Sequence, residues 1–200
     1  AIPWVLKAID GSAAPKESWL QLASSCYFET KQYRKAVGVL EILVADFPKK
    51  SYFIQLAALS NELGNEARAL AVLELAYHQK MLNQDSEYRN LAQLYLSQEI
   101  PFQAGRVMSK GMTSGIVKKD RKAYDLLAQS WLLARERELA LPALRESAAR
   151  GKDGNAYIRL AQLYLDQAEW AEAQKALALG VKKGDLRNPP MAHLLQGISF

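Results

Sequence analysis

Three glutamines recur along the chain in a pattern that suits hydrogen bonding to a peptide backbone. Gln93, Gln129 and Gln162 are separated by 36 and 33 residues, and a leucine follows each of them three positions later. A carboxamide both donates and accepts hydrogen bonds, so a row of glutamines can bind successive peptide groups of a partner. The alternative interpretation is that the glutamines bond neighbouring helices and that the leucines pack between repeats. Both interpretations require a structural element that repeats at this interval.

The residue types that commonly catalyse reactions are few and scattered. The two histidines, His78 and His193, lie at no metal-ligand spacing from a cysteine, a carboxylate or each other. The single cysteine, Cys26, adjoins a tyrosine of the expected core, where a thiol acts as a small apolar group. The sequence contains no phosphate-binding glycine loop and no Gly-x-Ser-x-Gly motif. We therefore predict that the protein is not an enzyme and holds no metal and no cofactor.

The composition favours an all-α protein. Half of the 200 residues are hydrophobic, strong helix formers dominate, and no apolar run is long enough to span a membrane. The formal net charge is +5, but the basic pairs are separated, fall in expected turns and have acidic residues near them. No base-reading set of side chains repeats along the chain. We therefore expect a protein or peptide partner and no nucleic acid.

Five segments carry the same apolar stripe, with the spacing i, i+3, i+4 and i+7 of one helix face. Their first residues are separated by 33, 35, 36 and 33 positions. The stripes consist of Leu20, Ala23, Ser24 and Tyr27; Phe53, Leu56, Ala57 and Ser60; Tyr88, Leu91, Ala92 and Tyr95; Tyr124, Leu127, Ala128 and Trp131; and Tyr157, Leu160, Ala161 and Tyr164. The recurrence predicts five helices with equivalent places in five repeats.

A second helix is expected after each of these first helices. Its pattern is an alanine followed four residues later by a larger apolar residue, and an alanine at a helix crossing lets two backbones approach closely. The five pairs are Ala36 and Leu40, Ala69 and Leu73, Ala104 and Met108, Ala140 and Leu144, and Ala173 and Leu177. The chain is therefore predicted to consist of stacked antiparallel helix pairs.

The period near 34, the small residues at the helix crossing, the aromatic residues of the first helices and the segment AEWAEAQKAL at 168–177 resemble the tetratricopeptide repeat (TPR) family. The resemblance implies an all-α, right-handed α-solenoid, a superhelix of about five complete repeats flanked by half-repeats. The chain departs from the family pattern in three ways, one of which is that the usual closing proline is clear only at Pro48. The glycine usual between the paired helices is present only as Gly64, and Ser60 replaces an aromatic residue. These departures leave the shapes of individual loops open.

The repeat pattern predicts one array over residues 1–200. The second helix of a truncated repeat is expected at 1–14, and the first helix of another at 190–200, so the chain is expected to be cut from a longer array. The complete repeats are predicted at 17–49, 50–84, 85–120, 121–153 and 154–189.

A second stripe lies about 100° around each first helix from the core stripe. The TPR resemblance implies that this stripe lines a concave groove and binds a peptide. The predicted groove residues are Phe28, Ile54, Asn61, Arg89, Gln93, Leu96, Asp125, Gln129, Leu132, Ile158, Gln162 and Leu165. A groove that clamps a terminal carboxylate with lysine and asparagine is not supported. The corresponding places hold Gln21, Ser25, Ile54 and Ala58.

Four longer segments are similar to the TPR proteins encoded with TonB–ExbB–ExbD systems of Gram-negative bacteria. They are PKESWLQLASSCYFETKQYRKAVGVLEILV, LAQLYLSQEIPFQAGRVM, GIVKKDRKAYDLLAQSWLLARE and GNAYIRLAQLYLDQAEW. This resemblance implies a periplasmic accessory of TonB-dependent transport whose partner is a component of that system, with the cytoplasm as the alternative location. We expect a scaffold that binds a partner's peptide segment. The alternative is a structural protein that self-associates through its convex face or its open ends.

Overall fold

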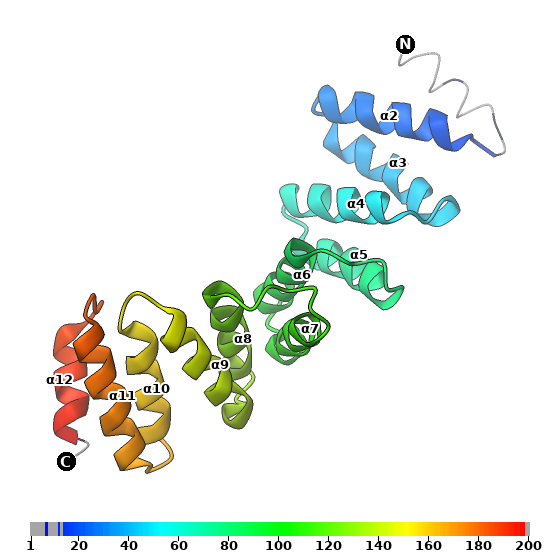
Figure 1. Ribbon diagram of the computed structural model, residues 1–200. Helices are drawn as coiled ribbons and strands as arrows, with labels where there is room; N and C mark the ends of the chain where they lie inside the picture. The colour runs from blue at the N-terminus through cyan, green and yellow to red at the C-terminus, as the bar shows by residue number, and fades with distance from the viewer. Residues whose placement is uncertain (1–6, 8–11, 13, 199–200) are drawn as a thin grey trace. The chain divides into compact units, whose positions relative to one another are not determined.

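The protein is all-α in the part of the chain that the computed structural model describes, which comprises residues 7, 12 and 14–198 (Figure 1). The predicted helix at 1–14 therefore lies almost wholly outside the described residues. The helices are α2 (Glu17–Glu29), α3 (Tyr33–Asp46), α4 (Lys50–Glu62), α5 (Glu66–His78), α6 (Asp85–Ser97), α7 (Pro101–Thr113), α8 (Arg121–Leu133), α9 (Arg137–Arg150), α10 (Asn155–Leu165), α11 (Trp170–Lys183) and α12 (Pro189–Ile198). None of these helices is long and apolar enough to cross a membrane.

The helices pack as successive antiparallel pairs, one pair in each predicted complete repeat. The chain divides into two compact units, residues 1–83 and 84–200. In the first unit, α2 packs on α3, α3 on α4 and α4 on α5. In the second unit, each helix from α6 to α12 packs on the next, and α6 also contacts α8. This arrangement confirms the predicted all-α solenoid packing of helix pairs.

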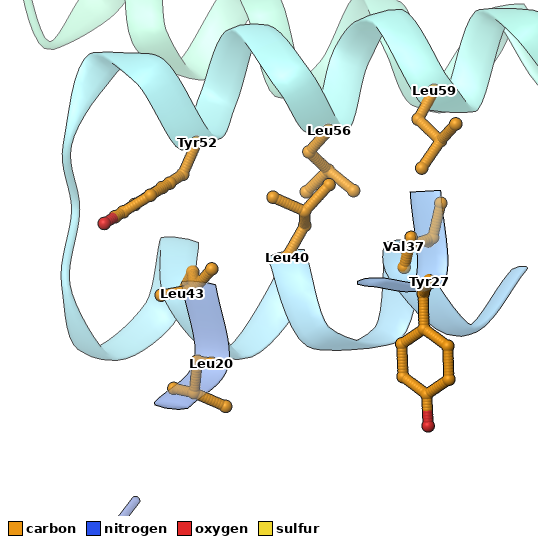
Figure 2. Close-up of a cluster of buried hydrophobic side chains, with 9 residues drawn as sticks. Leu20, Tyr27, Val37, Leu40, Leu43, Tyr52, Leu56 and Leu59 are labelled. Atoms are coloured by element: carbon orange, nitrogen blue, oxygen red, sulfur yellow. The ribbon is translucent and has the colours of Figure 1, made fainter. Parts of the chain in front are cut away.

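The core lies where the apolar stripes of the first helices meet the alanines of the second helices. All five alanines (Ala36, Ala69, Ala104, Ala140 and Ala173) are 0% exposed, so the packed helices enclose them completely at these crossings. Figure 2 shows the core of the first unit, where Leu40 of α3 lies next to Leu56 of α4 and where Leu20 and Tyr27 of α2 belong to the same cluster. The α3 and α4 side chains in this cluster include Leu40, Leu43 and Leu56.

The turn inside each helix pair closes in the same way in all five complete repeats. A residue two positions after the end of the first helix, or three positions after α10, adopts a left-handed backbone. The next backbone N–H donates to a carbonyl five residues earlier, as from Glu136 to Trp131 over 2.8 Å. This is the Schellman arrangement that ends many helices. The left-handed residues are Lys31, Gly64, Glu99, Arg135 and Ala168, with φ between 56° and 77°. The loops whose shapes could not be predicted from the sequence, because they lack the usual glycine, therefore all have the same shape.

Candidate peptide-binding surface

The three recurring glutamines lie at equivalent places on α6, α8 and α10 of the second unit. The side chains of Gln93, Gln129 and Gln162 are exposed, and none of them forms a hydrogen bond with another described residue. In this part of the chain the glutamines therefore do not bond neighbouring helices. Their amides face solvent, where they can donate to and accept from another molecule.

An apolar residue accompanies each glutamine on the same side of its helix. Leu96, Leu132 and Leu165 are half-buried, and Leu133 next to the second of them is 58% exposed. Residues three positions apart are neighbours on a helix surface. We call the set of Gln93, Leu96, Gln129, Leu132, Gln162 and Leu165 the glutamine–leucine row. Its leucines contribute to packing and still present apolar surface beside the amides.

Two charged residues of the predicted groove are held by the chain's own side chains. Arg89 donates from Nε to Asp85 over 2.6 Å and from Nη2 to Asp120 over 3.1 Å, and its side chain is only 17% exposed. Asp125 accepts hydrogen bonds from Ser147 and, over 3.3 Å, from Arg159. These groups therefore hold neighbouring elements of the second unit together.

The remaining predicted residues differ in exposure. Ile158 on α10 and Ile54 on α4 are half-buried, whereas Asn61 on α4 is exposed. Phe28 at the end of α2 is 58% exposed and lines a cleft of about 680 Å³ in the first unit. The binding of a peptide to any of these residues stays a prediction.

Polar contacts also link the start of each first helix to the loop that precedes the next repeat. We call these contacts the rim links, and the residues they join are 30 to 33 positions apart. The rim links are Glu17 to Lys49, Lys50 to Asn83, Asp85 to the backbone N–H of Lys118, Arg121 to Asp153, and Asn155 to the backbone carbonyl of Asp185. The repeat pattern of the sequence did not predict these contacts. The available signal was a charged or amide residue at the start of each first helix, about one repeat before a polar partner.

The strongest electrostatic perturbation on this rim is at Asp153. Burial raises the pKa of this carboxyl, but hydrogen bonds from the side chain and backbone of Asn155 and from Arg121 outweigh that effect. The pKa of Asp153 therefore falls from 3.8 to about 2. The Arg121 Nη2 atom lies 2.6 Å from the Asp153 carboxylate. The folded second unit thus favours the ionised form of Asp153.

This shift predicts a loss of stability in acid. Because the pKa of Asp153 is lower in the folded chain, its contribution is fully present above about pH 4 and disappears as the pH falls toward 2. We expect Asp153→Asn to lower the free energy of unfolding by about 1 kcal/mol at pH 7, since solvent screens part of the interaction. Urea unfolding at several pH values measures the difference, which should shrink below pH 4. Asp46→Asn at the exposed end of α3 is the control, and an equal effect there contradicts the prediction.

The described residues contain no group of three or more histidine, cysteine or acidic side chains placed to hold a metal ion. The surface of the second unit therefore offers exposed amides, partly exposed leucines and internally paired charges. This chemistry suits noncovalent binding of a peptide backbone with apolar side chains.

Several solved structures share the fold. YrrB, described as a TPR protein with an unusual peptide-binding site, is 12% identical over 98% of this chain and 100% of that chain, with a TM-score of 0.64. MamA from Desulfovibrio magneticus RS-1 is 14% identical over 86% and 95% of the two chains, with a TM-score of 0.59. The C-terminal part of a TPR repeat-containing protein from Cytophaga hutchinsonii is 13% identical over 88% and 68%, with a TM-score of 0.58. No family model and no curated protein matches the sequence. At these identities the structures show a TPR-like fold.

Proposed function

We propose that this chain is a non-catalytic scaffold that binds a peptide segment of a protein partner along the glutamine–leucine row. The observation that carries the proposal is the set of three exposed carboxamides at equivalent places on α6, α8 and α10, each without a hydrogen-bond partner among the described residues. A glutamine that supported the fold through a hydrogen bond would bond a neighbouring helix. The side-chain amides of these three glutamines are instead available to hydrogen-bond another molecule.

The spacing of packed helices suits an extended peptide. Packed helices lie about 8–10 Å apart. An extended or polyproline II peptide advances about 3.1–3.4 Å per residue. The helices that carry the glutamines alternate with α7 and α9 in the packing order. An extended peptide of several residues can therefore reach from one glutamine to the next, and side chains between these points can contact the leucines. The description of YrrB as peptide-binding supports the same class of ligand.

The narrower part of the proposal concerns the partner and the compartment. We infer that the partner is a component of a TonB–ExbB–ExbD system and that the chain acts in the periplasm. This inference rests on the four sequence segments that resemble TPR proteins of such systems. A cytoplasmic scaffold is the competing outcome, and the identity of the captured partner distinguishes the two.

A photocrosslinking amino acid at Gln129 tests the proposal. The matched control carries the same probe at Ala178, an exposed residue of α11, which is a second helix. In a Gram-negative periplasmic extract we expect a defined product from the Gln129 probe and none from the Ala178 probe. Recovery of a TonB-system component supports the narrower partner assignment. Equal products from both probes contradict a binding surface on the first helices.

Leu132→Glu supplies the second arm of this experiment. Leu132 is half-buried, so a carboxylate there places a charge in the row, and circular dichroism first establishes that the variant is folded. We expect the folded variant to lose at least about tenfold in affinity for the captured partner, the equivalent of one apolar contact. Undiminished binding overturns the proposed surface.

Self-association is the second candidate function. It is favoured by large apolar side chains exposed on a second helix, since Trp170 and Leu179 of α11 are 50% and 48% exposed. Light scattering over a range of protein concentrations separates the two functions. Self-association would be favoured if the scattering mass rises with protein concentration, if Trp170→Ala abolishes this rise and if Leu132→Glu does not.

A further inference from the structure

The first unit contains a cleft that small residues create. Ser25 on α2 and Ala58 on α4 both line it, and they occupy the repeat position that holds Gln93, Gln129 and Gln162 on α6, α8 and α10. A hydroxymethyl and a methyl group fill much less space than a glutamine side chain. The volume of the cleft is about 680 Å³. Ligand pockets are typically about 300–1,000 Å³, so this cleft is large enough for more than one side chain.

One wall of the cleft is aromatic. The rings of Phe28 and Tyr33 have centroids 5.6 Å apart and are inclined by 50°, and Phe28 is 58% exposed. Leu40 and Leu59 add buried apolar surface to the lining. An exposed aromatic face attracts cations as well as apolar groups, because its π-electrons give it negative character.

All the formal charge that lines the cleft is negative. Glu29 and Glu62 are the last residues of α2 and α4, both are exposed, and neither has an ion-pair or hydrogen-bond partner through its side chain among the described residues. No lysine or arginine lines the cleft. The charge pattern is therefore opposite to that of a groove that clamps a carboxylate. Two uncompensated carboxylates beside an aromatic wall favour a positively charged ligand.

We propose that this cleft binds an arginine side chain flanked by an apolar residue, presented by an extended peptide segment of a protein partner. The arginine guanidinium pairs with Glu29 and Glu62 while its methylene groups and the apolar neighbour lie against Phe28 and Tyr33. Arginine suits this environment better than lysine, since its planar group stacks on rings and bonds carboxylates at the same time. The inference rests on the proposed function only in taking the ligand to be a peptide.

Three synthetic peptides test the proposal: acetyl-Gly-Leu-Arg-Leu-Gly-amide and the same peptide with glutamine or glutamate in place of arginine. The readout is the change in backbone amide resonances of the ¹⁵N-labelled protein. We expect the arginine peptide to shift resonances of α2 and α4 around Phe28 and Ala58. We also expect it to bind about tenfold more tightly than the glutamine peptide at low salt, as two partly exposed ion pairs would give. This preference should weaken at about 0.3 M salt. Equal affinity of the two peptides overturns the proposal.

The chain itself supplies matched variants. The double variant Glu29→Gln/Glu62→Gln keeps the size of both side chains and should lose the arginine preference, about tenfold in affinity. Ala58→Gln introduces the residue found at this position in α6, α8 and α10, and it should close the cleft and abolish the shifts. All three substitutions are at exposed positions, and circular dichroism monitors folding. Unchanged arginine affinity in the double variant overturns the proposal.

Gln129→Ala separates this inference from the proposed function. It should leave arginine-peptide binding to the first unit unchanged, because Gln129 lies on α8 of the second unit. Shifts confined to α6, α8 and α10 would overturn the arginine site and leave the glutamine–leucine row standing. Binding at the cleft together with no product from the Gln129 probe would support the arginine site and contradict the row.

Discussion

Replacing Trp131 with alanine is expected to lower the free energy of unfolding of the second unit by about 3–5 kcal/mol, the range for removing a buried large aromatic side chain. Trp131 near the end of α8 is 5% exposed. Its ring meets that of Phe102 edge to face, with centroids 5.6 Å apart. The ring also covers Gly105 of α7, where an added Cβ atom would lie 2.7 Å from three ring carbons. The indole thus fills the space that the glycine leaves.

A double-mutant cycle between these two residues tests the packing directly. Gly105→Ala alone should lower the free energy of unfolding of the second unit by about 1–3 kcal/mol, because the added methyl group collides with the indole. In the double variant Gly105→Ala/Trp131→Ala the methyl group enters the space that the indole has vacated. The loss in free energy of unfolding should therefore be at least about 1 kcal/mol smaller than the sum of the losses in the two single variants. Urea unfolding gives all four free energies. Additive effects would contradict direct packing of Trp131 on Gly105. Trp170→Ala is the control, and a small effect is expected there because Trp170 is 50% exposed.

Gly154→Ala is expected to destabilise the second unit by about 3 kcal/mol, at the upper end of overpacking effects. A Cβ atom at Gly154 would lie 2.0 Å from the carbonyl oxygen of Gly180, so the two backbones must separate. The same approach lets the Gly154 N–H donate to the Gly184 carbonyl over 2.8 Å, a hydrogen bond that the shift would stretch. The φ of Gly154 is −83°, which alanine adopts readily, so the cost is steric.

Gly38→Ala is the matched control for this prediction. Gly38 lies inside α3, and nothing lies within 4 Å of the position its Cβ atom would occupy. Alanine there should stabilise the first unit by about 0.5–1 kcal/mol through its helix preference. Thermal and urea unfolding of both variants give the comparison. If the Gly154→Ala protein were as stable as the parent, the start of α10 and the end of α11 would not be in close contact.

The helix pairs could be predicted from the sequence because burial imposes a period on it. Every repeat must bury one face of its first helix and bring an alanine of its second helix to the crossing, so residues such as Leu91 and Ala104 recur at fixed intervals. The turns could not be predicted in this way. Their shape depends on backbone hydrogen bonds, which left Lys31 and Arg135 in a conformation that glycine usually adopts.

The candidate site was predictable only in part. The sequence places Gln129 and Asp125 on the same stripe of one helix, but the structure gives them different surroundings, with Asp125 held by Ser147 and Arg159 and Gln129 in solvent. The hydrogen-bond partner of a side chain comes from the neighbouring repeats. The helical period of the sequence does not specify that partner. The cleft beside Phe28 was missed for a related reason. The small residues Ser25 and Ala58 are visible in the sequence, whereas the space they leave depends on how α2 and α4 pack.

The rim links also constrain how such a chain can change in length. Each link joins the start of a first helix to the loop before the next one, as Arg121 joins Asp153. Duplicating a complete module would copy both ends of a link together and keep every partner within reach. Inserting a few residues into a helix would rotate the following side chains by about 100° each and carry one partner away. Evolution by whole-module duplication is therefore far less disruptive for this architecture than gradual lengthening of a single module.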